Sequence, residues 1–197
     1  MSLLLESAGL LADHQIRAAV QRGALGIEPF IPTTRHFADD ETTPVLSYGL
    51  SSCGYDLRLG KDFRAVVVRD PKAPAEGNGE ILRYDGPFLL FPKQYLLGVS
   101  VEYLKIPDNV EGRFIAKSSY ARCGLIVNMT PVEPGWSGRL TFSLSNPTDG
   151  PIRLYPGEGI AQILFTVMSS PPEKNYVARG GKYQGENGPT AGKVFSR

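Results

Sequence analysis

The sequence has few of the residues that build metal sites or disulfide frameworks. Its 197 residues include two cysteines, Cys53 and Cys123, which are far apart and not in CxxC spacing, and two histidines, His14 and His36. A structural zinc ion takes about four ligands, usually in closely spaced Cys or His pairs. We therefore expect no zinc. A single disulfide bond between the two cysteines is the alternative that the sequence leaves. Because nothing signals export, free thiols in a cytoplasmic protein are the simpler interpretation.

Long apolar runs and an excess of one charge are also missing. The segments Leu3–Leu5 and Leu10–Leu11 are too short and broken for a signal-peptide core or a membrane span. The formal net charge is +1, which gives no reason for a broad nucleic-acid or membrane surface. Affinity for an anion must come from a local cluster. We expect neither nucleic acid nor membrane as a partner.

Glycine and proline, in contrast, are abundant and separate short apolar runs. With 22 glycines, 16 prolines and no repeat of 20–50 residues, the chain predicts one mainly β domain over residues 1–197, a sandwich or barrel. The expected strands are Tyr55–Leu59, Phe63–Arg69, Ile81–Tyr84, Phe88–Phe91, Tyr95–Leu104, Val110–Ala116, Leu125–Met129, Arg139–Asn146, Ile152–Tyr155 and Gly159–Met168.

One helix is expected, within residues 10–23. Asp13 can cap its start, it continues to about Arg22, and Gly23 ends it.

The composition of the remaining segments does not favour regular secondary structure. We expect a loose leader over residues 1–9 and an irregular surface arm from Ile27 to Pro44, whose acidic run Asp39–Glu41 is solvated. The insert Asp70–Gly79 is rich in turn residues. The tail over residues 173–197 is polar and glycine-rich, so it should order only against a neighbouring surface or a ligand.

The stretch Gly112–Asn146 holds the first candidate site. Within it, Lys117–Arg122 places two cations around two hydroxyls, a combination that suits phosphate. A solvated polar loop is the alternative. Further on, alternation puts Leu140, Phe142 and Leu144 on one face of a strand and Arg139, Thr141, Ser143 and Ser145 on the other. The polar face meets a polar cavity or solvent, and the sequence alone favours solvent.

Two weaker candidates lie outside this stretch. Asp56 interrupts a strand beside Arg58, and a structural Asp–Arg pair is the default interpretation. The tail motif Arg179–Gly185 has glycines that let backbone amides approach an anion, and Lys182 supplies charge.

Together these segments resemble the dCTP deaminase family, which belongs to the trimeric dUTPase superfamily. The resemblance rests on KSSYARCGLIVNMTPVEPGWSG, with SSCGYDLRLG before it and PGEGIAQILF and RGGKYQG after it. It runs in order from the helix near Asp13 to the tail. It implies a distorted β-barrel or jelly roll of the dUTPase-like fold. It also implies a homotrimer with active sites at subunit interfaces and a tail that closes over the nucleotide.

Family deaminases convert dCTP to dUTP and ammonia without zinc, in pyrimidine deoxynucleotide metabolism. A carboxylate moves the protons as water attacks C4 of cytosine and the amine leaves. The resemblance implies that Ser118 and Arg122 orient this water and stabilise developing charge. It also implies that Asp56 orders the sugar or metal-bound water, and that Mg²⁺ enters with the triphosphate.

The resemblance assigns further residues to a deoxynucleoside triphosphate. The positions for the triphosphate are Lys117, Ser119, Tyr176 and Lys182. The backbone of Asn128, Met129, Thr130 and Pro131 would read the base, and Trp136, Tyr183, Gln184 and Glu186 complete the set.

The sequence departs from the family pattern at two positions. The family's catalytic glutamate, usually in T-L-E-F, matches Ser143, whose hydroxyl cannot shuttle a proton near neutral pH. The family tail usually reads K-Y-Q-G-Q, whereas here Glu186 takes the last position. A carboxylate beside a triphosphate is repulsive unless magnesium or Arg179 intervenes.

Three functions follow from these observations. The leading one is dCTP deamination. The second is a deoxynucleoside triphosphate diphosphatase, because Glu133 matches the catalytic aspartate of dUTPases. For Glu133 itself, a turn-stabilising or sugar-contacting role is favoured over catalysis. The third is a catalytically silent nucleotide-binding trimer, motivated by Ser143. A nucleotide with a modified pyrimidine or another base is a further candidate substrate, because backbone groups would recognise the base and the side-chain sequence does not specify it.

Overall fold

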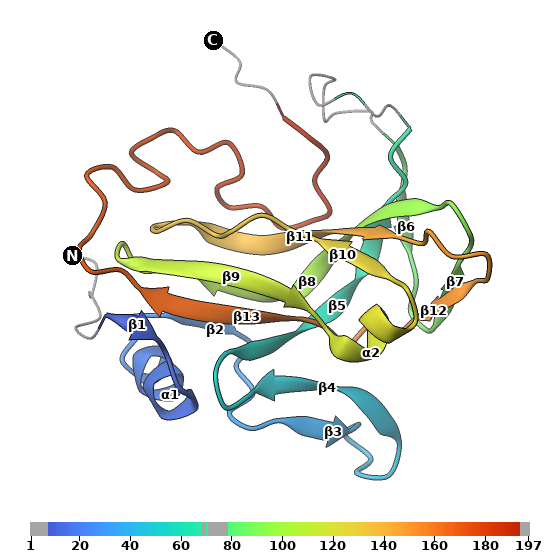
Figure 1. Cartoon of the computed structure of the whole chain (residues 1–197), viewed down its shortest axis with the longest axis horizontal. Coiled ribbons are helices and arrows are strands. Elements are labelled where there is room, and N and C mark those ends of the chain that lie inside the picture. The colour runs from blue at the N-terminus through green and yellow to red at the C-terminus, as the bar shows by residue number, and fades with distance from the viewer. Residues whose placement is uncertain (1–7, 68–69, 71–78, 194–197) are drawn as a thin grey trace.

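The chain is built mainly from β-strands, most of which join in one 11-stranded sheet (Figure 1). The computed structural model describes residues 8–67, 70 and 79–193. The main strand order is β1-β13-β5-β8-β11-β10, and β12 pairs with β7 in a separate two-stranded sheet. The mainly β class expected from the sequence is confirmed.

The strands and helices follow the apolar runs of the sequence. Their bounds are β1 Gly9–Leu10, α1 Asp13–Gln21, β2 Gly26–Glu28, β3 Arg35–Phe37, β4 Pro44–Leu50, β5 Tyr55–Arg64, β6 Ile81–Arg83, β7 Phe88–Leu90, β8 Tyr95–Lys105, β9 Val110–Ala116, α2 Ser118–Arg122, β10 Ile126–Asn128, β11 Ser137–Ser145, β12 Ile152–Leu154 and β13 Gly159–Val167.

The sheet curls because β5 belongs to both of its halves. The first part of β5 pairs with β13 and β4, and the second part pairs with β8 and β6. The register against β8 shifts between Leu59 and Phe63. Gly60 lies at this irregularity, where an added Cβ would meet the Val99 carbonyl oxygen at 2.8 Å. The two strands expected at Tyr55–Leu59 and Phe63–Arg69 are therefore one bent strand, which ends at Arg64.

The core takes one face of β11. Leu140, Phe142 and Leu144 are buried, at 7%, 0% and 0% exposure. The residues between them are only partly buried, as strand alternation requires. β11 therefore presents one face to the core and its other face to the opposite side of the sheet, as the alternation in the sequence predicts.

The N-terminal helix is confirmed, but its cap differs from the expectation. Ala12 is the N-cap, and its N–H donates to Gln15 Oε1 at 2.9 Å. Asp13 is already helical, and its carboxylate accepts the His14 N–H at 2.7 Å. Gly23 follows the helix with φ of 69°, the left-handed conformation that glycine adopts most easily.

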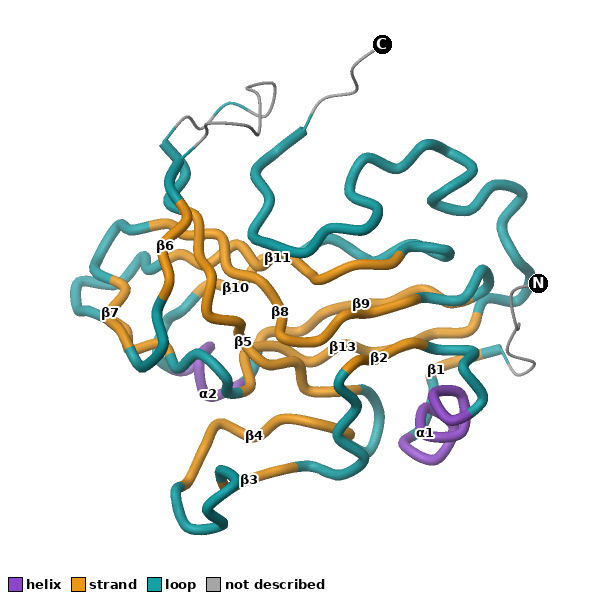
Figure 2. The backbone as a smooth tube through the Cα atoms, turned by 180° about the vertical axis from the view of Figure 1, so that it is seen from behind, coloured by secondary structure: helices purple, strands orange, loops and turns teal. Residues whose placement is uncertain are grey.

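The irregular arm expected from Ile27 to Pro44 is wrong in part. β2 pairs with β8, and β3 forms a hairpin with β4, on the side of the sheet opposite the tail (Figure 2). These strands are short, and their pairing depends on partners distant in the sequence, so local composition hid them. The acidic turn does behave as expected, because Asp40 accepts the Thr42 and Thr43 N–H groups in an exposed loop.

Some expectations fall on residues that the structure does not describe. These are most of the leader, the end of the strand expected to Arg69, most of the Asp70–Gly79 insert and the last four tail residues. Cys53 and Cys123 are free and exposed. No helix among the described residues has the length and apolar character needed to cross a bilayer.

Removing the Phe142 side chain tests the placement of the core. Phe142→Ala should lower the free energy of unfolding by about 3–5 kcal/mol, because a fully buried ring leaves a cavity. Phe37→Ala is the matched control, since Phe37 is 49% exposed, and it should change stability by about 0.5 kcal/mol or less. Urea unfolding of both variants measures the difference, and equal losses would contradict this core.

Candidate functional site

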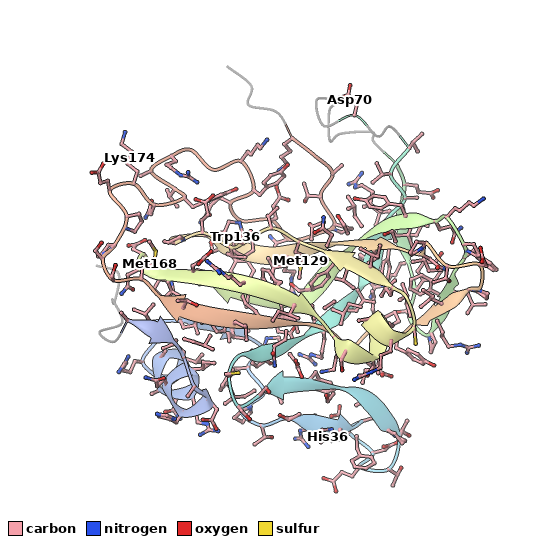
Figure 3. All side chains as sticks on the ribbon, in the orientation of Figure 1. His36, Asp70, Met129, Trp136, Met168 and Lys174 are labelled. Atoms are coloured by element: carbon pink, nitrogen blue, oxygen red, sulfur yellow. The ribbon has the colours of Figure 1, made fainter. Side chains whose placement is uncertain are left out.

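A cavity of about 1020 Å³ lies on the tail side of β11. Three parts of the chain line it: the partly buried face of β11, the segment between β10 and β11, and the C-terminal tail. Met129 and Trp136, two of its lining residues, lie on the side of the sheet that faces the tail (Figure 3). The cavity is large enough for a nucleotide-sized ligand.

The face of β11 that turns away from the core lines this cavity. Arg139, Thr141 and Ser143 all contribute, so this face meets a polar cavity, whereas the sequence alone favoured solvent. Ser143 Oγ forms a hydrogen bond with Tyr95 Oη at 3.0 Å. A second cavity, of about 590 Å³, also includes Thr141 and Ser143. Ser143 therefore lines both cavities, and its hydrogen-bond partner Tyr95 contributes a second hydroxyl group.

The segment between β10 and β11 forms one wall. Asn128, Met129, Thr130 and Pro131 line the cavity together, as the resemblance implies for residues that read a base. The wall is fixed by the paired backbone hydrogen bonds between Gly112 and Val132, at 2.8 and 2.9 Å. Its backbone groups are thus held by β9 in a defined position.

The C-terminal tail forms the cover of the cavity by bonding to β11. The Gly185 N–H donates to the Ser137 carbonyl at 2.8 Å, and the Arg139 N–H donates to the Glu186 carbonyl at 2.6 Å. The Trp136 Nε1–H donates to the Tyr183 carbonyl at 2.9 Å. The tail therefore orders against a neighbouring surface, as its composition predicts, and that surface belongs to its own chain.

Charged side chains pair across the cavity and along its cover. Arg179 forms an ion pair with Glu133, and Lys193 forms one with Glu186. Lys182 Nζ donates to the Lys193 carbonyl. The cations expected to meet a triphosphate thus have protein partners here. A bound anion would have to compete with these partners.

Tyr176 joins the tail to this charged region. Its Oη accepts the Tyr183 N–H at 3.0 Å. Burial raises the pKa of Tyr176, and the carboxylates of Glu133 and Glu186 add to the increase, so the phenol keeps its proton. Gly181 packs against its ring, where an added Cβ would lie 2.1 Å from a ring carbon. This glycine therefore has a steric role that the sequence did not predict.

The cluster Lys117–Arg122 does not line this cavity. It forms the short helix α2, which the sequence did not predict, with Lys117 as its N-cap. Ser118, Ser119 and Arg122 are exposed. α2 lies on the side of the sheet opposite the tail (Figures 1 and 2). Within one chain the two groups of candidate residues are apart.

Asp56 and Lys117 form a buried ion pair. Their side chains are 9% and 12% exposed, and Lys117 Nζ lies 2.6 Å from Asp56 Oδ2. The Asp56–Arg58 pair taken as the default is wrong, because Arg58 Nε instead donates to Glu102 at 2.7 Å. Lys117 comes from β9's end and Glu102 from β8, so sheet pairing brings both partners in from distant parts of the chain.

The described residues hold no group of three or more His, Cys, Asp or Glu side chains that could bind a metal ion. His36 lies on the β3–β4 hairpin, far from the cavity (Figure 3). The Asp56 carboxylate, which was expected near the sugar or metal-bound water, forms an ion pair with Lys117.

Sequence reasoning missed three residues beside the cavity. Tyr95 reaches Ser143 because β8 and β11 are antiparallel neighbours. The Thr190 N–H donates to Thr141 Oγ1 at 3.1 Å, and Lys193 reaches Glu186. No short-range pattern marks such contacts, although the alternation on β11 showed which face could receive them.

Fold and site together define a curled β-sheet protein with a cavity of mixed charge under a C-terminal tail. A family model described as dCTP deaminase-like matches residues 10–168. The dCTP deaminase of Granulibacter bethesdensis is 40% identical over 185 residues, which cover 91% of this chain and 96% of that protein. The dCTP deaminase of Pseudomonas paraeruginosa is 41% identical over 188 residues, 93% and 98% of the two chains. The chain belongs to the dCTP deaminase family, an enzyme family of nucleotide metabolism.

A solved structure supports the fold. The 2'-deoxycytidine 5'-triphosphate deaminase from Agrobacterium tumefaciens superposes with a TM-score of 0.61 at 22% identity. The match covers 82% of this chain and 49% of that chain, so this chain spans about half of it. At this identity the likeness concerns the fold alone. The mainly β fold expected from the sequence is the fold of this deaminase.

Asp56→Asn tests whether the buried ion pair with Lys117 at the start of α2 stabilises the fold. The substitution leaves the Lys117 ammonium buried without its counter-charge, so the free energy of unfolding should fall by about 3–5 kcal/mol. Asp85→Asn is the matched control. Asp85 pairs with Lys61 at the surface, where water screens the pair, so its loss should cost far less stability. Denaturant unfolding separates the two, and a loss at Asp56 no larger than at Asp85 would contradict a buried pair.

Proposed function

We propose that this protein is a deaminase that hydrolyses dCTP to dUTP and ammonia. The observation that carries the proposal is identity of about 40% to dCTP deaminases over nearly the whole of both chains. Among the described residues, the cavity under the tail is the larger of the two cavities described above, and it contains most of the positions that the family resemblance assigns to the nucleotide. A cytoplasmic location, expected from the sequence, belongs to the same proposal.

The cavity supplies the binding groups for this substrate. The backbone from Asn128 to Pro131 would read the cytosine, since its amides and carbonyls are held at the cavity wall. Lys182 and Tyr176 would contact the triphosphate, which brings magnesium with it. For this contact Lys182 exchanges its bond to the Lys193 carbonyl for a phosphate oxygen, and the stronger charge-assisted bond favours the exchange.

The residues on α2 would complete the site from a neighbouring subunit. Ser118, Ser119 and Arg122 are exposed and lie away from the cavity of their own chain, which supports a role in the cavity of another copy. In a homotrimer with sites at subunit interfaces, Ser118 and Arg122 orient the attacking water and stabilise charge that develops at C4. Asp56 holds Lys117 at the start of this helix.

A diphosphatase is the second candidate, because the Glu133 carboxylate lines the same cavity. In that reaction Glu133 would take a proton from the water that attacks the α-phosphate, and pyrophosphate would leave. The Glu133–Arg179 ion pair would have to open first.

Product analysis distinguishes these functions. The protein is incubated with magnesium and each deoxynucleoside triphosphate separately, and the products are resolved by chromatography. We expect dUTP and one equivalent of ammonia from dCTP. A monophosphate with pyrophosphate would support the diphosphatase instead. Measurable binding of dCTP with no product from any nucleotide would support a catalytically silent nucleotide-binding protein instead.

Shared sites can be tested with two inactive variants. Arg122→Ala changes α2 and Lys182→Ala changes the cavity, so each variant alone should lose most activity. Mixed trimers formed by subunit exchange contain some sites with an intact α2 and an intact cavity, and activity should return. Light scattering should give three times the 21.4 kDa chain mass. A monomer, or a mixture that stays inactive after exchange, would contradict sites shared between subunits.

A further inference from the structure

The tail brings a carboxylate to the polar face of β11. The Glu186 backbone is fixed there by the Arg139 N–H, which donates to its carbonyl at 2.6 Å. Gly138 permits this approach, because an added Cβ would lie 3.1 Å from both Glu186 N and O. The Glu186 side chain is 16% exposed and lines the main cavity. It therefore points into the cavity under the tail.

Hydrogen bonds connect this carboxylate to the strand beside Ser143. The Thr190 hydroxyl donates to Glu186 Oε2, and Lys193 Nζ pairs with Oε1. The Thr190 N–H in turn donates to Thr141 Oγ1 at 3.1 Å. Thr141 and Ser143 are two residues apart on one strand, so their side chains are neighbours on the same face. Glu186 and Ser143 thus line one cavity with Thr141 and Thr190 between them.

The two departures from the family pattern complement each other in this arrangement. At position 143 a serine stands where the resemblance places the catalytic glutamate, and at position 186 a glutamate stands where it places glutamine. Each change alone is unfavourable: the serine cannot shuttle a proton, and a carboxylate repels a triphosphate. Together they keep one carboxylate on the polar side of β11.

We propose that Glu186 is the catalytic base and acid of this enzyme, replacing the carboxylate absent at position 143. The inference rests on the proposed deamination of dCTP. Glu186 takes a proton from water as the water oxygen bonds to C4, and gives that proton to N3 of cytosine. It then takes the proton of the new C4 hydroxyl and gives it to the amine. The C4–N bond breaks, ammonia leaves, and Glu186 is again a carboxylate.

The surroundings of Glu186 suit this role. Lys193 and Thr190 hold its two oxygens, and Tyr95 and Ser143 offer hydroxyls to water on the strand side. The other titratable groups that line the cavity are Glu133, Arg139, Tyr176, Arg179, Lys182 and Tyr183. Glu133 is the other carboxylate among these lining residues, and it pairs with Arg179, whereas Glu186 pairs with Lys193.

Moving the carboxylate back to the strand tests the proposal. Glu186→Gln restores the usual family residue in the tail, and it should lower kcat for dCTP by about 10²–10⁴-fold while KM stays the same or falls. The double variant Ser143→Glu with Glu186→Gln places the carboxylate on β11 and should regain most of the lost rate. Circular dichroism and light scattering show whether each variant keeps its fold and assembly.

The pH dependence of kcat gives a second readout. A base must be ionised to accept a proton, so the wild-type kcat should fall toward acidic pH. This limb should disappear from the residual rate of Glu186→Gln and return in the double variant. Glu173→Gln is the matched control, because Glu173 is an exposed tail carboxylate outside the cavity, and its profile should match wild type.

The outcomes separate this proposal from the function on which it rests. Absence of dUTP from the wild-type protein would overturn the proposed deamination itself. Formation of dUTP by wild type at a rate that Glu186→Gln leaves unchanged or increases would overturn the role of Glu186 alone. A rise in KM at constant kcat would also overturn it, because that change marks a binding contact.

Discussion

The alternation of side chains along β11 is the constraint on which both the core and the cavity depend. One face of the strand, with Phe142 at its centre, is closed by the core, and the other face carries Thr141 and Ser143 into the cavity. Since the period of a strand is two residues, a register slip of one residue would exchange the two faces. The same pairing that buries the core therefore also positions the site.

The tail depends on the same strand. Its backbone groups bond to β11 at Ser137 and Arg139, so a segment with few apolar anchors is ordered mainly by hydrogen bonds. Such contacts contribute modest net stability, about 1 kcal/mol each. A cover held in this way can open at low cost. The Arg179–Glu133 ion pair joins this cover to the cavity wall, and the Lys193–Glu186 pair lies within the cover.

The chain also contains a second kind of charged contact, in which the partners are buried. Asp56 and Lys117 connect β5 to the start of α2, and Arg58 and Glu102 connect β5 to β8. Burial raises the pKa of Glu102, while Arg58 opposes this increase. These pairs are costly to break and fix the framework, whereas the Arg179–Glu133 pair of the tail is exposed and can exchange partners. The distinction separates a rigid support from a movable cover.

The sequence by itself determined the mainly β class, most strand positions, the N-terminal helix and the two faces of β11, because these follow from periodicities of a few residues. Its motifs also indicated the family, and the residues from Asn128 to Pro131 do line one cavity. The short strands β2 and β3, the bend of β5 and the partners of Asp56 and Arg58 were decided only by the tertiary structure. Their stability comes from segments far away in the chain. The meeting of Glu186 with the polar face of β11 has the same origin: a tail residue reaches a strand only when the folded sheet offers free backbone groups to receive it.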